Sequence, residues 1–134
     1  VGADAGYPVH FIEHTLSAHH DVTHAAGLAA INPSWMRFAA KTRPARFAQF
    51  AQRVFGLPAS PDAFSCALAG IDKFEEFLVS IGCPTSLSQL GIGPELIPTY
   101  AKETLRVIND GQGRLPGRPA MSEQDIIDVL TAAL

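Results

Sequence analysis

The sequence of 134 residues predicts an all-α protein, a multi-helical domain of about seven helices. Three observations support this fold class. Apolar residues recur with the helical period along most of the chain. No segment alternates apolar and polar residues over a strand's length between turn signals. Proline, glycine and capping residues punctuate the chain at intervals typical of helices. With 47% hydrophobic and 17% charged residues, residues 1–134 are expected to fold around one core.

The first two helices are expected on either side of a short turn. Proline is favoured in a first helical turn, so the first helix is expected to begin near Pro8 and to run to about His20. Asp21 or Thr23 is expected to cap the next helix, because either side-chain oxygen can accept from the exposed amides that follow. Pro33 lies inside this second pattern, where it is expected to bend or break the helix.

The third and fourth helices are predicted by their boundaries and by two apolar stripes. Pro44 opens the third helix, which ends at Gly56, and the segment 60–62 starts the fourth, which ends before Gly82. The apolar residues at helical spacing are Phe47, Phe50, Ala51 and Val54, followed by Phe64, Leu68, Ile71, Phe74, Phe77, Leu78 and Ile81. Aromatic residues in such stripes are expected to pack in the core.

The C-terminal part alternates between spacers and helices. Residues 83–91 form a spacer before a helix over residues 93–108, and residues 109–119 form a loop rich in glycine and proline. Residues 122–125 (Ser-Glu-Gln-Asp) resemble an acidic N-terminal cap, and the apolar residues that follow them complete the last helix.

Charge and hydropathy exclude several classes of partner. The net charge is −3 and the ten basic residues are scattered, so no nucleic acid is expected as a partner. No apolar run approaches the roughly 20 residues of a membrane span, so no membrane partner is expected either. The opening residues 1–6 lack the features of a signal peptide and an initiator methionine, so a cytoplasmic segment cut from a longer chain is expected. Because no glycine-rich phosphate motif occurs, most of any nucleotide site is expected elsewhere.

All five histidines lie between His10 and His24. His10 and His14 are four residues apart, so on a helix they project from one face. His24 follows after enough chain for a turn, so it can present a third imidazole from a second element. Imidazole is the commonest protein ligand for transition metals, and this pattern therefore predicts a metal site.

Two further interpretations of this region stay open. The segment from His10 to His14 fits H-x-x-E-H, the inverted zinc-peptidase signature, in which both histidines bind zinc and Glu13 activates water. That five-residue pattern often matches by chance, and a peptidase needs a third ligand and a substrate cleft. The other interpretation is a non-enzymatic helical interaction domain, which folds alone and needs a partner domain to work.

A longer stretch resembles the iron-containing alcohol dehydrogenases, most closely the butanol-dehydrogenase-type branch. The resemblance is strongest over residues 10–36, which contain the paired His-x-x-x-His, a further His ten residues after the pair, Gly-Leu-Ala, and Pro-Ser-Trp-Met. It continues more weakly through residues 47–56, 82–87 and 122–126. It implies the C-terminal domain of the dehydroquinate-synthase-like fold, in which a dinucleotide-binding domain precedes an all-helical one. The resemblance implies that this N-terminal domain lies outside the present chain.

The resemblance also implies roles for individual residues. In the family one Asp and three His hold the metal in a cleft between the two domains, and the match assigns two of these ligands to His10 and His24. It assigns His14 to the nicotinamide and substrate side, where this histidine relays a proton and contributes to cofactor binding. The remaining two ligands, an Asp and a His on an earlier helix, are expected upstream of Val1, as is the nucleotide-binding domain. Ala25 stands where the family usually has glycine, so it is expected either to crowd the site or to shift the start of a helix.

The implied chemistry is hydride transfer between a small alcohol or aldehyde and NAD or NADP. Fe²⁺, or Zn²⁺ in its place, acts as a Lewis acid that lowers the pKa of the alcohol, and the nicotinamide takes the hydride. Phe11, Trp35 and Phe38 are candidates for the pocket wall, although core packing is the commoner role of such residues. With two of the four ligands, the isolated chain is expected to be inactive. An apolar cleft near His10 and His24 is expected, which self-association into a homo-oligomer can bury.

Overall fold

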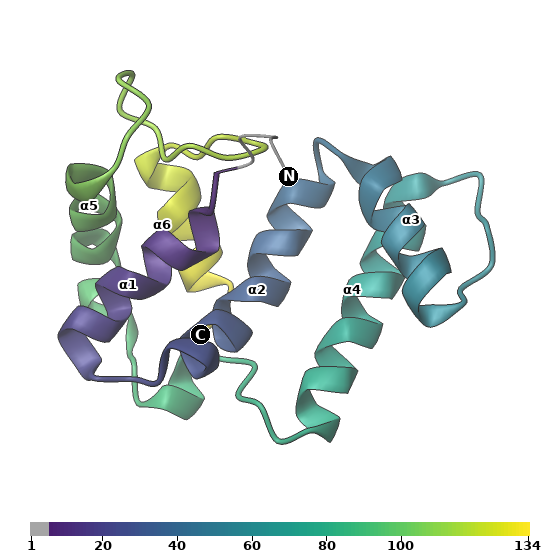
Figure 1. The fold of residues 1–134 in the computed structure, drawn as a ribbon, viewed down its shortest axis with the longest axis horizontal. Helices are drawn as coiled ribbons and strands as arrows, with labels where there is room; N and C mark the ends of the chain where they lie inside the picture. The colour runs from purple at the N-terminus through teal and green to yellow at the C-terminus, as the bar shows by residue number, and fades with distance from the viewer. Residues whose placement is uncertain (1–5) are drawn as a thin grey trace.

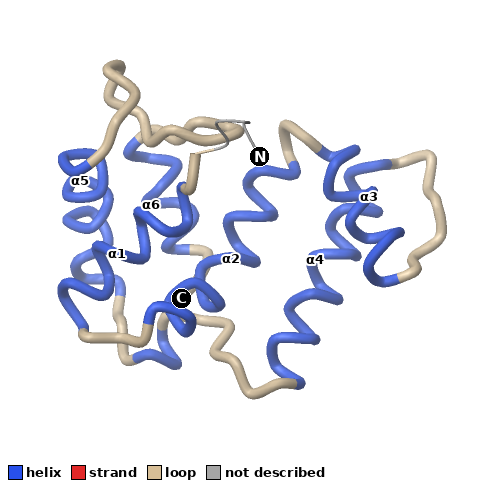
Figure 2. Tube along the Cα trace, viewed as in Figure 1, coloured by secondary structure: helices blue, strands red, loops and turns tan. Residues whose placement is uncertain are grey.

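The computed structural model of the chain describes residues 6–134, so the interpretation of the opening residues rests mainly on a segment outside the described part. The helices are α1 (Pro8–His20), α2 (His24–Ala40), α3 (Pro44–Phe55), α4 (Ala63–Ser80), α5 (Ile97–Val107) and α6 (Glu123–Thr131), with short 3₁₀ turns at Ser88–Leu90 and Pro94–Leu96. Figure 2 shows no strand in residues 6–134, where the pairing of Leu115 with Met121 is an isolated bridge. The all-α prediction is confirmed, with six helices in this range and not seven.

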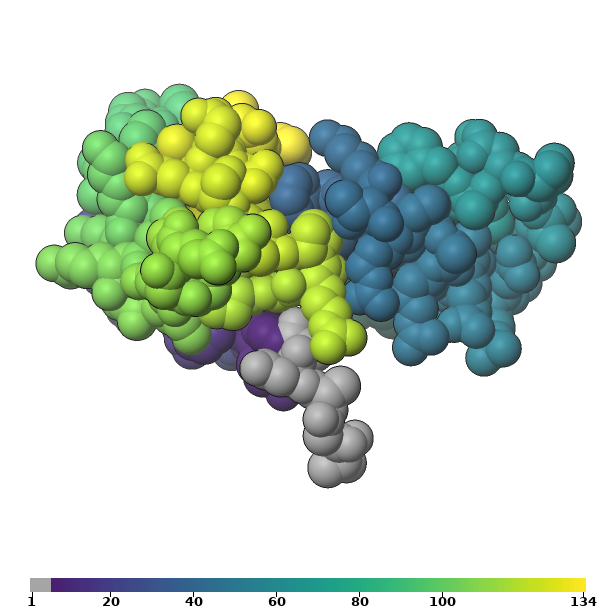
Figure 3. All heavy atoms as spheres, turned by 90° about the horizontal axis from the view of Figure 1, so that it is seen from above, coloured from purple at the N-terminus to yellow at the C-terminus, as the bar shows by residue number. Residues whose placement is uncertain are grey.

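Helix α2 is the central element of the fold. It contacts α1, α3, α4 and α6, while α5 packs against α1 and α6 on one side and α3 pairs with α4 on the other. Figure 1 shows α2 between these two groups, and the view from above in Figure 3 shows the α3–α4 pair projecting from the rest. None of the helices in the described range combines the length and hydrophobicity needed to cross a membrane.

Two apolar cores flank α2, and a third, small cluster of Ala48, Ala51 and Cys66 lies between α3 and α4. The larger one is formed by fully buried side chains of α1, α2, α5, α6 and the loops between them, including Ile12, Leu16, Ile31, Leu87, Ile92, Tyr100, Leu115, Met121, Ile126 and Leu130. Each such aliphatic side chain contributes about 1.5–3 kcal/mol when it leaves water. The smaller core joins α2 to α3 and α4 around Met36, Ala40, Ala67 and Ile71.

The aromatic stripes are only partly in the core. Phe47, Phe50 and Phe74 pack against the smaller core, as predicted. Phe77 is 49% exposed, so the prediction that it packs in the core is wrong, and Phe64 of the same stripe is 36% exposed. The reason is geometric: α4 packs mainly against α2 and α3, and these two helices cover part of its circumference.

Pro33 does not break α2, which runs unbroken from His24 to Ala40. The residue after it, Ser34, is buried, and its hydroxyl lies 2.9 Å from the carbonyl of Ile31 and 3.0 Å from the carbonyl of Val129 in α6. Proline removes one helical hydrogen bond, but packing on both sides of α2 outweighs that loss. Of the two outcomes expected at Pro33, a bend or a break, the break does not occur.

The predicted caps fall into two groups. The Asp62 carboxylate accepts from the amides of Phe64 and Ser65 at the start of α4, and Ser122 forms a capping box with Asp125 at the start of α6. Thr23 occupies the capping position of α2, but its side chain makes no capping bond. Asp21 ends α1 in the left-handed conformation, with φ of 50°. The turn between α1 and α2 is thus not capped by either side chain that the sequence suggested.

Polar contacts hold α1 against α5. The hydroxyls of Thr15 and Thr104, both buried, lie 3.0 Å apart. The hydroxyl of Tyr100 lies 2.5 Å from Nε2 of His20. Burial raises the pKa of Tyr100, and the charges of nearby Glu95 and Glu103 raise it further, so the phenol stays protonated in its hydrogen bond with the imidazole. These contacts fix the orientation of the helix that carries two of the clustered histidines.

The phenol of Tyr100 predicts a measurable contribution to stability. Tyr100→Phe should lower the free energy of unfolding by about 1 kcal/mol, because the bond to His20 is lost. Urea denaturation monitored by circular dichroism measures this change. Tyr7→Phe is the matched control, because Tyr7 is 65% exposed and should leave the unfolding midpoint unchanged. Equal stability of the wild-type chain and Tyr100→Phe would contradict the role of this contact.

Candidate metal centre

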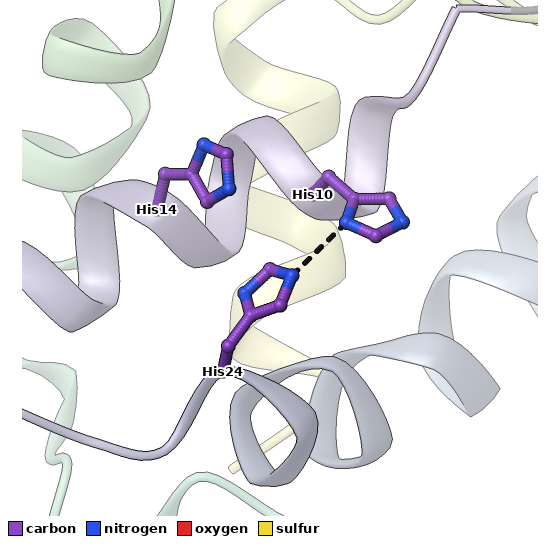
Figure 4. A group of neighbouring side chains, drawn as sticks. All are labelled: His10, His14 and His24. Carbon is purple, nitrogen blue, oxygen red and sulfur yellow. Dashed lines mark hydrogen bonds between the residues drawn. The ribbon is translucent and has the colours of Figure 1, made fainter.

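Three histidines meet at the junction of α1 and α2 (Figure 4). His10 and His14 lie one turn apart on α1, and His24 is the first residue of α2. One ring nitrogen of each lies within 4.8 Å of the other two, and all three residues are exposed. The predicted placement of His10 and His14 on one helix, with His24 opening the next, is confirmed.

His24 is the middle member of this histidine cluster. Its ring centroid lies 5.2 Å from those of His10 and His14, which are 6.5 Å from each other. Nδ1 of His10 and Nε2 of His24 are 3.2 Å apart (dashed line in Figure 4). Two nitrogens bound tetrahedrally to zinc at about 2.0–2.1 Å are separated by about 3.3 Å. The two imidazoles are therefore already spaced for one shared ion of the kind that nitrogen ligands bind, such as iron or zinc.

The carboxylate of Glu13 orients His24. Glu13 is fully buried, and its two oxygens accept hydrogen bonds from Nδ1 of His24 and from the hydroxyl of Ser17. With the proton of a neutral imidazole held at Nδ1, the lone pair of Nε2 faces the cluster. Carboxylate–histidine pairs of this kind are the usual support of a metal-binding imidazole. The donor set and its support thus fit a transition metal.

A glycine in α2 makes room for this carboxylate. A Cβ atom at Gly27 would lie 2.6 Å from Cγ and 2.7 Å from Oε1 of Glu13, closer than real Cβ contacts. The contact of Glu13 with His24 and the role of Gly27 were not predicted from the sequence. The available signals were the i,i+4 spacing of Glu13 and Ser17 on one helix face and the glycine one turn after His24.

The same geometry disfavours the peptidase interpretation. An H-x-x-E-H peptidase needs Glu13 next to a water on the metal. Here the Glu13 side chain is 0% exposed and is engaged by Ser17 and by the nitrogen of His24 that faces away from His10. A water-activating role for this carboxylate is not supported.

An open hollow of about 200 Å³ adjoins His10. Its lining combines apolar side chains of Tyr7, Val9 and Leu28 with Asn32 and Trp35. Within residues 6–134, the indole nitrogen of Trp35 is the one buried side-chain nitrogen or oxygen without a hydrogen-bond partner. Of the three aromatic residues suggested as pocket walls, Trp35 lines this hollow, whereas Phe11 and Phe38 do not and pack partly buried against the larger core.

Ala25, at the position where glycine was expected, is exposed in the first turn of α2. Helix α2 nevertheless begins at His24, as the sequence pattern predicted. The replacement has therefore not displaced the start of this helix, and the imidazole of His24 keeps its place against His10 and Glu13.

Comparison with known proteins gives a consistent family match. Residues 2–134 match the model for the C-terminal region of the Fe-containing alcohol dehydrogenase family. The probable NADH-dependent butanol dehydrogenase 1 of Bacillus subtilis is 36% identical over 135 residues, which cover 100% of this chain and 34% of that protein. The NADPH-dependent aldehyde reductase YqhD of Escherichia coli is 30% identical over 104 residues, or 76% of this chain and 26% of that protein.

Comparison of the structure with solved structures agrees with this family match. The crystal structure of NADH-dependent butanol dehydrogenase A from Thermotoga maritima superposes with a TM-score of 0.86 at 30% identity, covering 96% of this chain and 33% of that one. A structure of YqhD gives a TM-score of 0.87 at 25% identity, covering 99% of this chain and 34% of that one. The chain therefore spans about a third of the length of these relatives.

Proposed function

Since this chain belongs to the Fe-containing alcohol dehydrogenase family and corresponds to its C-terminal region, we propose that it supplies part of the metal site of an NAD(P)-dependent alcohol or aldehyde oxidoreductase. The observation that carries this proposal is the 3.2 Å separation of His10 Nδ1 and His24 Nε2, with Glu13 on the other nitrogen of His24. We assign these two histidines as ligands of Fe²⁺ or Zn²⁺. Family membership and the buried Glu13 argue against both the peptidase and the non-enzymatic interpretation.

The proposed chemistry divides between the bound groups and the chain. When bound, the metal supplies Lewis-acid polarisation of the alcohol or aldehyde oxygen, and NAD or NADP accepts or gives the hydride. His10 and His24 hold the metal through the nitrogens that face each other. His14 lies beside them, and from the family resemblance we assign it to the nicotinamide and substrate side, where one of its ring nitrogens passes a proton between substrate and water. The hollow with Tyr7 and Trp35 contacts the apolar part of a small alcohol.

The proposal requires a partner for the histidine face. All three imidazoles are exposed, and an ion held by two of them keeps open positions. The relatives are about three times as long as this chain, which supports an upstream part with a helix that completes the ligand set and a nucleotide-binding domain that holds the cofactor. In its absence, a homo-oligomer would cover the apolar hollow beside His10.

Metal binding tests the ligand assignment. In a zinc titration of the chain followed by calorimetry, His10→Ala and His24→Ala should each weaken binding by more than about tenfold, because each loses a bond worth more than about 1.4 kcal/mol. His14→Ala should change the affinity little. His19→Ala is the control outside the cluster, since its imidazole pairs with Glu103. A loss in His14→Ala equal to that in His10→Ala would make His14 a ligand and overturn its assigned role.

Activity tests the enzymatic proposal. A chimera that joins this chain to the upstream part of the Bacillus subtilis relative, loaded with Fe²⁺, should oxidise a simple primary alcohol with NAD, whereas the chain alone should not. His24→Ala should abolish this activity by removing a ligand. His14→Ala should retain the metal and lower kcat by about 100-fold or more, the usual contribution of a proton-transferring group. A fully active His24→Ala chimera would contradict the proposal.

A further inference from the structure

The surroundings of Glu13 are not explained by packing alone. Its side chain is fully buried between α1 and α2, where an apolar residue of similar volume would stabilise the fold equally well or better. A buried carboxylate is tolerated only when donors compensate for the loss of water. Glu13 has two such donors, and one of them is the imidazole of His24.

The two donors belong to different helices. Ser17 lies one turn after Glu13 on α1, and its hydroxyl is placed between Oε1 of Glu13 and, at 3.2 Å, the carbonyl of Val22 in the turn before α2. This leaves Oε2 for Nδ1 of His24. The carboxylate therefore has one oxygen anchored to its own helix and the other directed at the first residue of the next helix.

Gly27 completes this arrangement from α2. The missing side chain at Gly27 leaves the space that Cγ and Oε1 of Glu13 occupy. Any larger residue there would push the carboxylate away from its present position. Gly27 is helical and has no positive φ, so its lack of a side chain, and not its backbone freedom, is what the site uses.

We infer that Glu13 is a positioning residue for His24: it holds the proton of the neutral imidazole at Nδ1, so that the lone pair of Nε2 faces the metal position, and Gly27 provides the space for it. The metal part of this inference rests on the proposed function. The tautomer of His24 does not, because the contacts that set it are complete within the chain without any ion.

The tautomer is tested first, on the metal-free chain. Nitrogen-15 NMR of the histidine side chains, at a pH high enough to keep imidazole neutral, should show His24 with its proton on Nδ1. Glu13→Leu should shift this equilibrium towards Nε2, since no acceptor remains for Nδ1. Glu13→Gln should preserve the Nδ1 form, because its amide oxygen can still accept from His24 while its amide nitrogen faces Ser17. A wild-type His24 protonated on Nε2 would overturn the inference, whatever the metal does.

Zinc affinity is the second measurement. Glu13→Leu should weaken zinc binding by about 10- to 100-fold, the usual cost of losing the partner of a ligand histidine, and Glu13→Gln should recover most of that loss. Glu103→Leu is the matched control, because Glu103 pairs with His19 at 2.7 Å outside the cluster and should leave the affinity unchanged. If both Glu13 variants weakened zinc binding equally while His24 kept its tautomer, the carboxylate would act only by its charge and the positioning role would be wrong.

Variants at Gly27 distinguish the effect of Glu13 on zinc affinity from its effect on the stability of the fold. Gly27→Ala should weaken zinc binding and lower the urea midpoint, because the new methyl crowds Glu13. In the double variant Glu13→Ala with Gly27→Ala the crowding is gone, so the urea midpoint should recover while the zinc affinity stays low. Recovery of both would show that Glu13 acts only through packing and would overturn the inference. If the wild-type chain alone bound no zinc, the titrations would be repeated on the chimera with the upstream part of the Bacillus subtilis relative, where absence of binding would overturn the proposed metal site. The NMR result would still decide the role of Glu13.

Discussion

The buried carboxylate of Glu13 joins the packing of α1 on α2 to the orientation of the histidine at their junction. Because this carboxylate is fully buried, its two oxygens need hydrogen-bond donors from the protein. These donors are Ser17 of its own helix and His24 of the next one. Its volume requires a glycine at position 27. Because the carboxylate cannot move towards water without losing these bonds, the two helices approach each other in one way, and Nε2 of His24 is set opposite His10.

The remaining structure keeps this junction in place. Helix α2 is packed on both sides, by α1 and α6 and by α3 and α4, so its first turn is supported by the whole length of the helix. Helix α1 is held from behind by α5, through the paired hydroxyls of Thr15 and Thr104 and the contact of His20 with Tyr100. The histidines themselves are exposed at the edge of this framework. A packed support with three histidines at its surface suits the proposed site, whose remaining ligands an upstream part of the protein would contribute.

The helix boundaries could be predicted because local chemistry sets them. Pro8 and Pro44 open helices, Gly56 ends one in a left-handed conformation, and Ser122 caps the last. The placement of three imidazoles on two neighbouring elements followed from spacing alone, and the likeness to a known family followed from the residues around them. Where competing packing forces decide the outcome, local signals failed: α2 continues through Pro33 because neighbours on both sides hold it.

The sequence by itself therefore determined the fold class, most of the helix boundaries, the grouping of the histidines and the family, since each depends on residues close together in the chain. Only the tertiary structure decided the position of the Glu13 side chain. Its role depends on contacts across the turn with His24 and Gly27. In the local pattern H-x-x-E-H, Glu13 lies between His10 and His14, where a peptidase has its catalytic base. The crossing of α1 and α2 places it beneath His24, because how closely two helices approach depends on the side chains of both and cannot be read from either one.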